Sequence, residues 1–163
     1  WREPADHGDA GVMLRHDDGR PFARGAVPIA IRPAGSEQTS LRIHVPVLVE
    51  GLQTEAMVDT GGVYLVLDPE LATGLGLEPR DALESVRLLM RGSSCEGDLF
   101  RLSVAFAGIQ DDAVEVEATA FIPRVAAGER WPLGTVLGFA GRLERLCFAV
   151  DPGANMFYFG DLS

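Results

Sequence analysis

The chain has 163 residues, of which 47% are hydrophobic and 23% charged, and its formal net charge is −10. This size favours a single domain, and the apolar fraction is large enough to form a core and excludes a disordered chain. The balance of 24 acidic against 14 basic residues disfavours nucleic acid and anionic membrane surfaces as partners, since both attract basic stripes.

The N-terminal residues 1–25 are rich in Asp, Arg, Gly and His and show no sustained period, so we interpret them as a solvated leader or linker. The folded domain is predicted to span residues 26–163. Its first half contains short runs of strand-forming residues separated by turn signals. These runs predict strands at 26–32, 41–51, 52–59 and 63–68, with Gly51 at the turn between the second and the third.

Residues 41–51 alternate between apolar and polar side chains. The alternation places Leu41, Ile43, Val45 and Val47 on one face of the strand, which we expect to be the buried face. His44 lies on the opposite face, and we expect it to be a surface residue rather than a ligand.

A short helix is predicted over residues 69–77, because Pro69 suits the first helical turn and the glycines that follow suit its end. The remaining pattern is again one of short strands. It predicts a hairpin at 84–108 with a small polar tip at 91–97, followed by a strand at 113–123. A loop at 124–132, in which Trp131 packs, leads to an apolar strand end with one or two helical turns at 134–146. A closing hairpin is predicted at 147–160. Mostly short strands with one or two short helices predict an all-β barrel or sandwich-like body.

The sequence Asp59-Thr60-Gly61-Gly62 stands between two of the predicted strands. Asp, Thr and Gly favour turns for backbone reasons, so taken alone this stretch favours a plain turn. A carboxylate held at the end of a strand is also a candidate for chemistry, and the surrounding segments decide between the two interpretations.

The order of segments around this turn resembles the retropepsin-like aspartic protease family, which includes retroviral proteases and bacterial relatives. The resemblance covers about residues 41–160 and rests on three motifs. Val58-Asp59-Thr60-Gly61 matches the active-site loop, residues 88–101 match the flap hairpin, and Val136-Leu137-Gly138 followed by a helical turn matches the late apolar-apolar-Gly segment. The fold implied is a small closed β-barrel of the acid-protease type with one or two short helices.

The resemblance implies a role for each matched residue. Asp59 would be the catalytic aspartate, Thr60 would bond through its hydroxyl to the partner's loop, and Gly61 would donate its N–H to the carboxylate. Gly62 stands where the family usually has Ala or Ser, which removes a side-chain contact and loosens the loop. The flap tip would close over a bound peptide, and it comprises Arg91, Gly92, Ser93, Ser94, Cys95, Glu96 and Gly97. The structural neighbours of the site would be Val136, Leu137 and Gly138.

Peptide hydrolysis by carboxylates requires two of them to share one proton, because like charges about 3 Å apart do not both ionise easily. The chain contains a single Asp-Thr-Gly sequence, so the enzyme hypothesis requires a homodimer, or a partner with a second loop, acting on a peptide or protein. The last strand is a candidate for the sheet between the two chains. Two alternatives remain: a catalytically weak or inactive module that binds peptide or dimerises, and an unrelated β-barrel in which residues 59–62 are only a turn.

The two cysteines, Cys95 and Cys147, are too few for a disulfide framework or a metal cluster; we interpret them as free thiols, with a single disulfide between them as the alternative. We therefore predict no metal or other cofactor. No apolar run reaches the roughly 18 residues of a membrane helix, so no membrane insertion of this segment is predicted. No signal peptide is visible, but the chain begins at Trp1 rather than Met, so no compartment is assigned.

Overall fold

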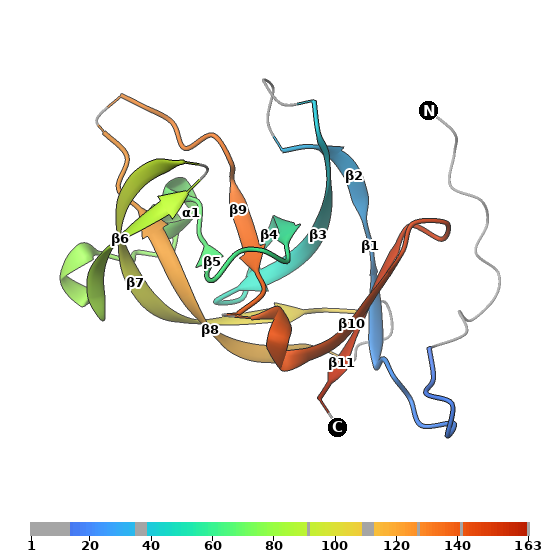
Figure 1. The fold of residues 1–163 in the computed structure, drawn as a ribbon. Helices are drawn as coiled ribbons and strands as arrows, with labels where there is room; N and C mark the ends of the chain where they lie inside the picture. Colours follow the sequence, from blue (N-terminus) through green and yellow to red (C-terminus); the bar gives the residue numbers. More distant parts are fainter. Residues whose placement is uncertain are drawn as a thin grey trace.

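The computed structural model describes residues 14–34, 39–90, 92–108, 113–126, 128–140 and 142–162, and in these the chain is mostly β-strand (Figure 1). The strands are β1 (Gly25–Pro28), β2 (Ala30–Pro33), β3 (Leu41–Val49), β4 (Leu52–Asp59), β5 (Leu65–Val66), β6 (Glu84–Met90), β7 (Ser93–Phe106), β8 (Val114–Pro123), β9 (Thr135–Gly138), β10 (Leu146–Asp151) and β11 (Met156–Asp161). The helical elements are α1 (Pro69–Gly74) and the 3-10 turns η1 (Pro79–Asp81) and η2 (Leu143–Arg145). The predicted all-β class is confirmed.

The larger sheet closes on itself. Its strand order is β2-β3-β4-β9-β5-β8-β7-β6, and an additional pairing joins β3 to β7. That pairing connects Leu48 with Ala105 and Val49 with Val104. Six strands, β3, β4, β9, β5, β8 and β7, therefore form a ring, while β2 and β6 extend from it. The β6–β7 hairpin extends from the ring at the left of Figure 1, below the loop that leads to β9.

The smaller sheet has the order β1-β11-β10. Residues 26–32, predicted as one strand, instead divide at Ile29 into β1 and β2, which belong to different sheets. The expectation that the last strand joins two chains is also wrong, because β11 pairs with β1 along one edge and with β10 along the other. A strand with both edges occupied offers no free ladder to a partner.

Apolar side chains form two clusters. The main cluster fills the ring and the space under the smaller sheet, where Phe106 stacks on Phe157 and Phe159 with ring centroids 5.2 and 5.1 Å apart. The second cluster lies beneath the β6–β7 hairpin and is built on Met57, Val66, Leu99, Phe121 and Val136. Trp131 packs against this second cluster, as predicted.

His44 is buried, with 4% of its surface exposed, so the prediction of a surface residue is wrong. Of the face that the alternating pattern in β3 predicted to be buried, Val45 and Val47 are buried and Ile43 is half-buried, but Leu41 is 63% exposed at the start of the strand. The pattern gave no sign that the other face is covered as well. His44 lies in register with Met57 on β4, and Met57 belongs to the second apolar cluster.

The helix α1 forms as the sequence predicts. Asp68 caps it, because its carboxylate accepts a hydrogen bond of 2.8 Å from the N–H of Glu70. Pro69 occupies the first turn, and Gly76 follows the helix with a φ of 71°. In chain order, α1 follows β5 and precedes the β6–β7 hairpin, so it lies between the Asp59 loop and that hairpin in the sequence.

Candidate active site

The loop at residues 59–62 begins where β4 ends. β4 runs parallel to β9, and Asp59 is in register with Gly138, so two of the three predicted motifs lie side by side. The N–H of Gly61 donates to Oδ1 of Asp59 at 3.1 Å, and the N–H of Phe139 donates to the carbonyl of Gly62 at 2.8 Å. The loop is therefore anchored by its own backbone and by the chain that follows β9.

Gly138 lies so close to the neighbouring chain that no side chain fits. A Cβ at this position would be 2.2 Å from the carbonyl oxygen of Tyr64. Gly62 is less confined, since a Cβ there would lie 3.3 Å from the Cα of Gly138 and 3.7 Å from Cγ of Asp59. The apolar-apolar-Gly pattern thus has a physical reason here: β9 passes against the loop at backbone contact distance.

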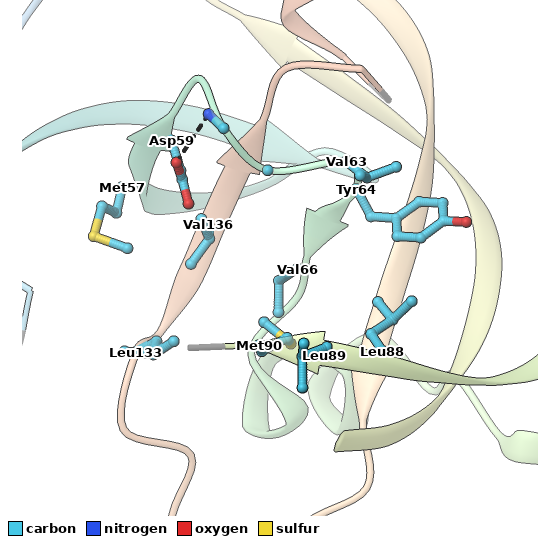
Figure 2. A pocket seen from close by; sticks show the side chains of 12 residues that line it. Met57, Asp59, Val63, Tyr64, Val66, Leu88, Leu89, Met90, Leu133 and Val136 are labelled. Carbon is cyan, nitrogen blue, oxygen red and sulfur yellow. Dashed lines mark hydrogen bonds between the residues drawn. The ribbon is translucent and has the colours of Figure 1, made fainter. Parts of the chain in front are cut away.

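A cleft of about 300 Å³ opens in front of the loop. Figure 2 shows the Asp59 carboxylate pointing from the loop towards the space between Met57 and Val136, with the β6 side chains on the far side. Asp59 is the one carboxylate among the lining residues, and the other lining side chains are apolar except for the phenol of Tyr64. The lining residues are Met57, Asp59, Gly61, Gly62, Val63, Tyr64, Val66, Leu88, Leu89, Met90, Leu133 and Val136.

The β6–β7 hairpin has a much shorter tip than the predicted 91–97. Strand pairing continues to Met90 and Ser93, so only Arg91 and Gly92 remain for the turn. Arg91 lies outside the described residues, and Gly92 has the left-handed φ of 81° that favours glycine. The rest of the predicted tip, Ser93, Ser94, Cys95, Glu96 and Gly97, belongs to β7. Small and polar residues suggested a loop, but here they form a solvated strand.

The two faces of the hairpin differ in character. Val86, Leu88, Met90 and Cys95 pack against the second apolar cluster, which places them on the cleft side. Burial raises the pKa of the Cys95 thiol above its usual range, so this thiol stays protonated at neutral pH. The opposite face carries the cross-strand pair Arg87–Glu96.

Asp59 is an exposed residue, as are Thr60 and Gly61. Two large apolar side chains next to the loop are exposed as well, Val63 at 58% and Phe139 at 41%. The cleft is thus open at its Asp59 end, where a carboxylate and apolar side chains share one surface. Such a surface is typical of a site that a second molecule completes.

The structure brings some of the predicted residues together and separates others. Asp59, Gly61, Gly62 and Val136 line the cleft, while Leu137 is fully buried in the main core. The described residues of the predicted tip do not line it; the β6 side chains Leu88, Leu89 and Met90 do. Sequence analysis also missed Met57, although its spacing of two from Asp59 in a strand places both side chains on one face.

Three negative findings apply to the described part of the chain. It contains no group of three or more His, Cys, Asp or Glu side chains that could hold a metal ion. Cys95 and Cys147 are free thiols there. None of its helices has the length and apolarity needed to cross a membrane.

Comparison with known proteins places these features in context. A family model described as aspartyl protease matches residues 45–131, more than half of the chain. A solved retropepsin-like aspartic protease from Rickettsia conorii is similar at 20% identity and a TM-score of 0.54, over 85% of this chain and 94% of that one. The retroviral protease-like domain of Ddi1 from Leishmania major is similar at 16% identity and a TM-score of 0.50, over 75% and 94%. These two likenesses show the retropepsin-like fold, and no curated protein matches the chain.

Proposed function

The chain belongs to the aspartyl protease family, and we propose that it is an aspartic endopeptidase that works as a homodimer, with one Asp59 from each protomer. The observation that carries this proposal is the position of Asp59. It is an exposed carboxylate at the open end of an apolar cleft, and no second carboxylate lines that cleft among the described residues. A two-fold axis beside the loop would bring the missing carboxylate from an identical chain.

The proposed reaction uses the two Asp59 carboxylates as a unit that shares one proton. The ionised carboxylate takes a proton from a water molecule, which attacks the peptide carbonyl. The protonated carboxylate donates its proton to the carbonyl oxygen, which gives a tetrahedral diol. In the second step the carboxyl group that took the proton from water donates it to the amide nitrogen, the other carboxylate takes a proton from a diol hydroxyl, and the C–N bond breaks to give a carboxylic acid and an amine. Because the two groups titrate together, the apparent pKa values belong to the pair and not to either residue. The N–H of Gly61 supports the ionised form, since it already donates to Oδ1 of Asp59.

The neighbouring residues have supporting roles in this proposal. Thr60 follows Asp59 at the exposed end of the loop, where its hydroxyl is available to the partner's loop. Gly138 gives β9 its close approach to the chain at Tyr64, and Gly62 faces Gly138 from the loop, where a Cβ would lie 3.3 Å from the Cα of Gly138. The β6–β7 hairpin is the flap that covers a bound peptide, and its Leu88 and Met90 contribute the apolar wall opposite Asp59.

We also propose that residues 26–163 form the protease domain and that residues 1–25 precede it as a leader or linker. The end of this leader contacts the domain, because Ala23 is buried and the N–H of Arg24 donates to the carbonyl of Phe159 at 2.8 Å.

A peptide-library digest that compares wild type with Asp59→Asn tests the proposed activity. Asn keeps the shape of the side chain but removes the titrating carboxyl, so we expect cleavage at mildly acidic pH to fall by at least about a thousandfold while the fold persists. Circular dichroism and thermal melting are the controls for folding. Undiminished cleavage by Asp59→Asn contradicts the proposal. A wild-type dimer that binds peptides and cleaves none favours the alternative of a peptide-binding module.

A further inference from the structure

Three polar side chains form a cluster at the base of the flap hairpin, on the face away from the cleft. They come from three neighbouring segments: Ser85 from β6, Asp98 from β7, and Arg124 from the residue that follows β8. Arg124 donates two hydrogen bonds to the Asp98 carboxylate, from Nε to Oδ2 at 3.0 Å and from Nη2 to Oδ1 at 2.5 Å. The Ser85 hydroxyl donates to Oδ1 of Asp98 at 2.6 Å and accepts from Nη2 of Arg124 at 2.7 Å.

Burial of the Asp98 carboxylate distinguishes this cluster from ordinary surface ion pairs, although 48% of the Arg124 side chain is exposed. Only 5% of the Asp98 side chain is exposed, whereas both partners of the Arg101–Glu117 pair on the adjacent stretch of β7 and β8 are more than half exposed. Burial alone raises the pKa of the Asp98 carboxyl, but the bonds from Arg124 and Ser85 outweigh it and hold that pKa below its usual range. Separating a buried carboxylate from the guanidinium that binds it with two hydrogen bonds costs considerable free energy.

The cluster lies at the point where the flap leaves the barrel. The β7–β8 register ends at Gly97 and Pro123, and the N–H of Arg124 donates to the carbonyl of Glu96 at 2.8 Å. Beyond this point, β7 pairs only with β6. A Cβ at Gly97 would be 2.3 Å from the carbonyl oxygen of Ile122, so β7 and β8 are tightly packed at the last residue pair that they share. Residues 87–90 and 92–95 therefore extend from the barrel and are joined to it at one end.

Arg124 also begins the segment that forms another wall of the cleft. This segment runs from the end of β8 to β9 and carries Trp131, which packs on the second apolar cluster, and Leu133, which lines the cleft. In Figure 2, Leu133 lies across from the β6 side chains Met90 and Leu89. The Arg124 side chain thus connects the segment that bears Leu133 to the strands that bear Met90.

We propose that Ser85, Asp98 and Arg124 form a positioning clamp, which fixes the base of the flap relative to the segment 124–134 and so sets the geometry in which peptide is held. The clamp touches neither substrate nor the Asp59 carboxylates. Its effect on peptide binding rests on the proposed protease function, whereas its effect on the flap itself does not.

The matched variants Arg124→Lys and Arg101→Lys test the clamp. Both keep the positive charge, but lysine lacks the planar guanidinium group that donates two parallel hydrogen bonds to a carboxylate. We expect amide hydrogen exchange of residues 86–90 and 94–96 to accelerate about tenfold in Arg124→Lys, and to stay at the wild-type rate in Arg101→Lys. Ser85→Ala gives a second, milder variant that leaves the ion pair intact and shifts the same amides in the same direction.

Peptide binding and kinetics then test the link to substrate. In the Asp59→Asn background, Arg124→Lys is expected to weaken peptide affinity about tenfold, and in the active enzyme to raise KM by a similar factor with kcat nearly unchanged. Unchanged exchange in Arg124→Lys overturns the clamp, whether or not the protein cleaves peptides. Accelerated exchange with unchanged affinity and KM overturns its role in holding substrate. If the wild-type protein cleaves no peptide, the proposed function is refuted, and the hydrogen-exchange result alone decides whether the clamp exists.

Discussion

Gly62 and Gly138, which lie on the two sides of the Asp59 loop, differ in the space available to them. The carbonyl oxygen of Tyr64 would lie 2.2 Å from a Cβ at Gly138, which is far inside contact distance and involves backbone that does not swing away. Around Gly62 the nearest atom is at 3.3 Å. The two motifs therefore combine a glycine that the fold requires, Gly138, with one at which a methyl group needs only a small shift of its neighbours, Gly62.

Gly138→Ala and Gly62→Ala are a matched pair that measures this difference. We expect Gly138→Ala to lower the free energy of unfolding by about 3 kcal/mol or more, because β9 must move away from the chain at Tyr64. For Gly62→Ala we expect a change within about 1 kcal/mol, since a small shift relieves the contact and alanine restricts the unfolded chain. Urea denaturation measures both. Similar losses in the two variants contradict this account of the loop.

The burial of His44 predicts a dependence of stability on pH. Burial first, and then the positive charge of Arg32, lower the pKa of His44 below its ordinary value of 6.5. Above pH 6.5 the imidazole is neutral in both states, so folding is not penalised. As the pH falls through 6.5, the unfolded chain takes up a proton that the folded protein resists, and stability is lost until the pH passes below the folded pKa.

Urea denaturation at pH 7 and pH 5 of wild type and His44→Leu tests this contribution. We expect the free energy of unfolding of wild type to fall between the two pH values by up to about 1.4 kcal/mol per pH unit from this group, and by less in His44→Leu. Equal falls in both proteins show that His44 is not responsible. The comparison matters for function, because the proposed chemistry operates at mildly acidic pH.

Among the elements, those defined by local pattern could be predicted from the sequence. The helix α1, the strand β8 and the closing hairpin β10–β11 follow from turn residues, a proline and alternation within a few positions. The parallel contact of β4 with β9 joins residues almost 80 positions apart, Ala56 with Thr135, and no local pattern encodes it. The resemblance to a known family placed Val136, Leu137 and Gly138 near the site, but the parallel pairing itself was not predicted.

The remaining errors have a common cause, which is that local patterns do not reveal what covers an element. Nothing in the apolar run at 26–32 marks Ile29 as the point where the chain passes from one sheet to the other. The polar residues after Gly92 suggested a loop, because a solvated strand and a loop have similar composition. For the same reason the loop residues of the candidate site were found, while the opposite wall on β6 was not.

The residue that precedes the 3-10 turn η2, Arg142, places a charged side chain in the core. Arg142 is fully buried; its Nη1 donates to the carbonyl of Val116 at 3.0 Å, and its guanidinium lies 5.1 Å from the centre of the Phe106 ring. Its Nε and Nη2 have no hydrogen-bond partner among the described residues, and burial lowers its pKa to about 10. A buried cation with unpaired donors opposes folding.

Substitution of Arg142 separates the contribution of its charge from that of its volume. Arg142→Met keeps an apolar side chain over Phe106 and removes the unpaired donors, so we expect stability equal to or above that of wild type. Arg142→Ala opens a cavity and is expected to cost about 2–5 kcal/mol. Chemical denaturation at neutral pH measures both. A loss in Arg142→Met as large as that in Arg142→Ala shows that the charge itself stabilises the fold.

At the scale of the whole molecule, the smaller sheet and the Asp59 face have different capacities for association. In the β1-β11-β10 sheet the central strand β11 is paired along both edges, so β11 cannot pair with a second copy. The face around the Asp59 loop carries exposed Val63 and Phe139, and the N–H of Phe139 ties that residue directly to Gly62. Apolar side chains around an exposed carboxylate favour this face as the contact that the proposed homodimer requires.

Phe139→Glu and Leu52→Glu test this face as a matched pair. The two side chains are similarly exposed, 41% and 44%, but Leu52 begins β4 and Asp59 ends it, about 23 Å apart at 3.3 Å per residue. We expect Phe139→Glu to weaken dimerisation more than tenfold, because two like charges would meet across the axis, and Leu52→Glu to leave it unchanged. Sedimentation equilibrium measures the dimer, and cleavage assays over a range of protein concentration measure its consequence.

The activity of Phe139→Glu should then fall steeply on dilution, since the active species contains two chains and its amount varies with the square of the free protomer concentration when dimers are scarce. Asp59→Asn, by contrast, should abolish cleavage at every concentration and leave the dimer intact, because it changes the chemistry without placing a new charge at the contact. If the activity per chain of wild type stays constant down to concentrations at which sedimentation finds only monomers, then one Asp59 suffices and the shared-proton mechanism does not apply to this protein.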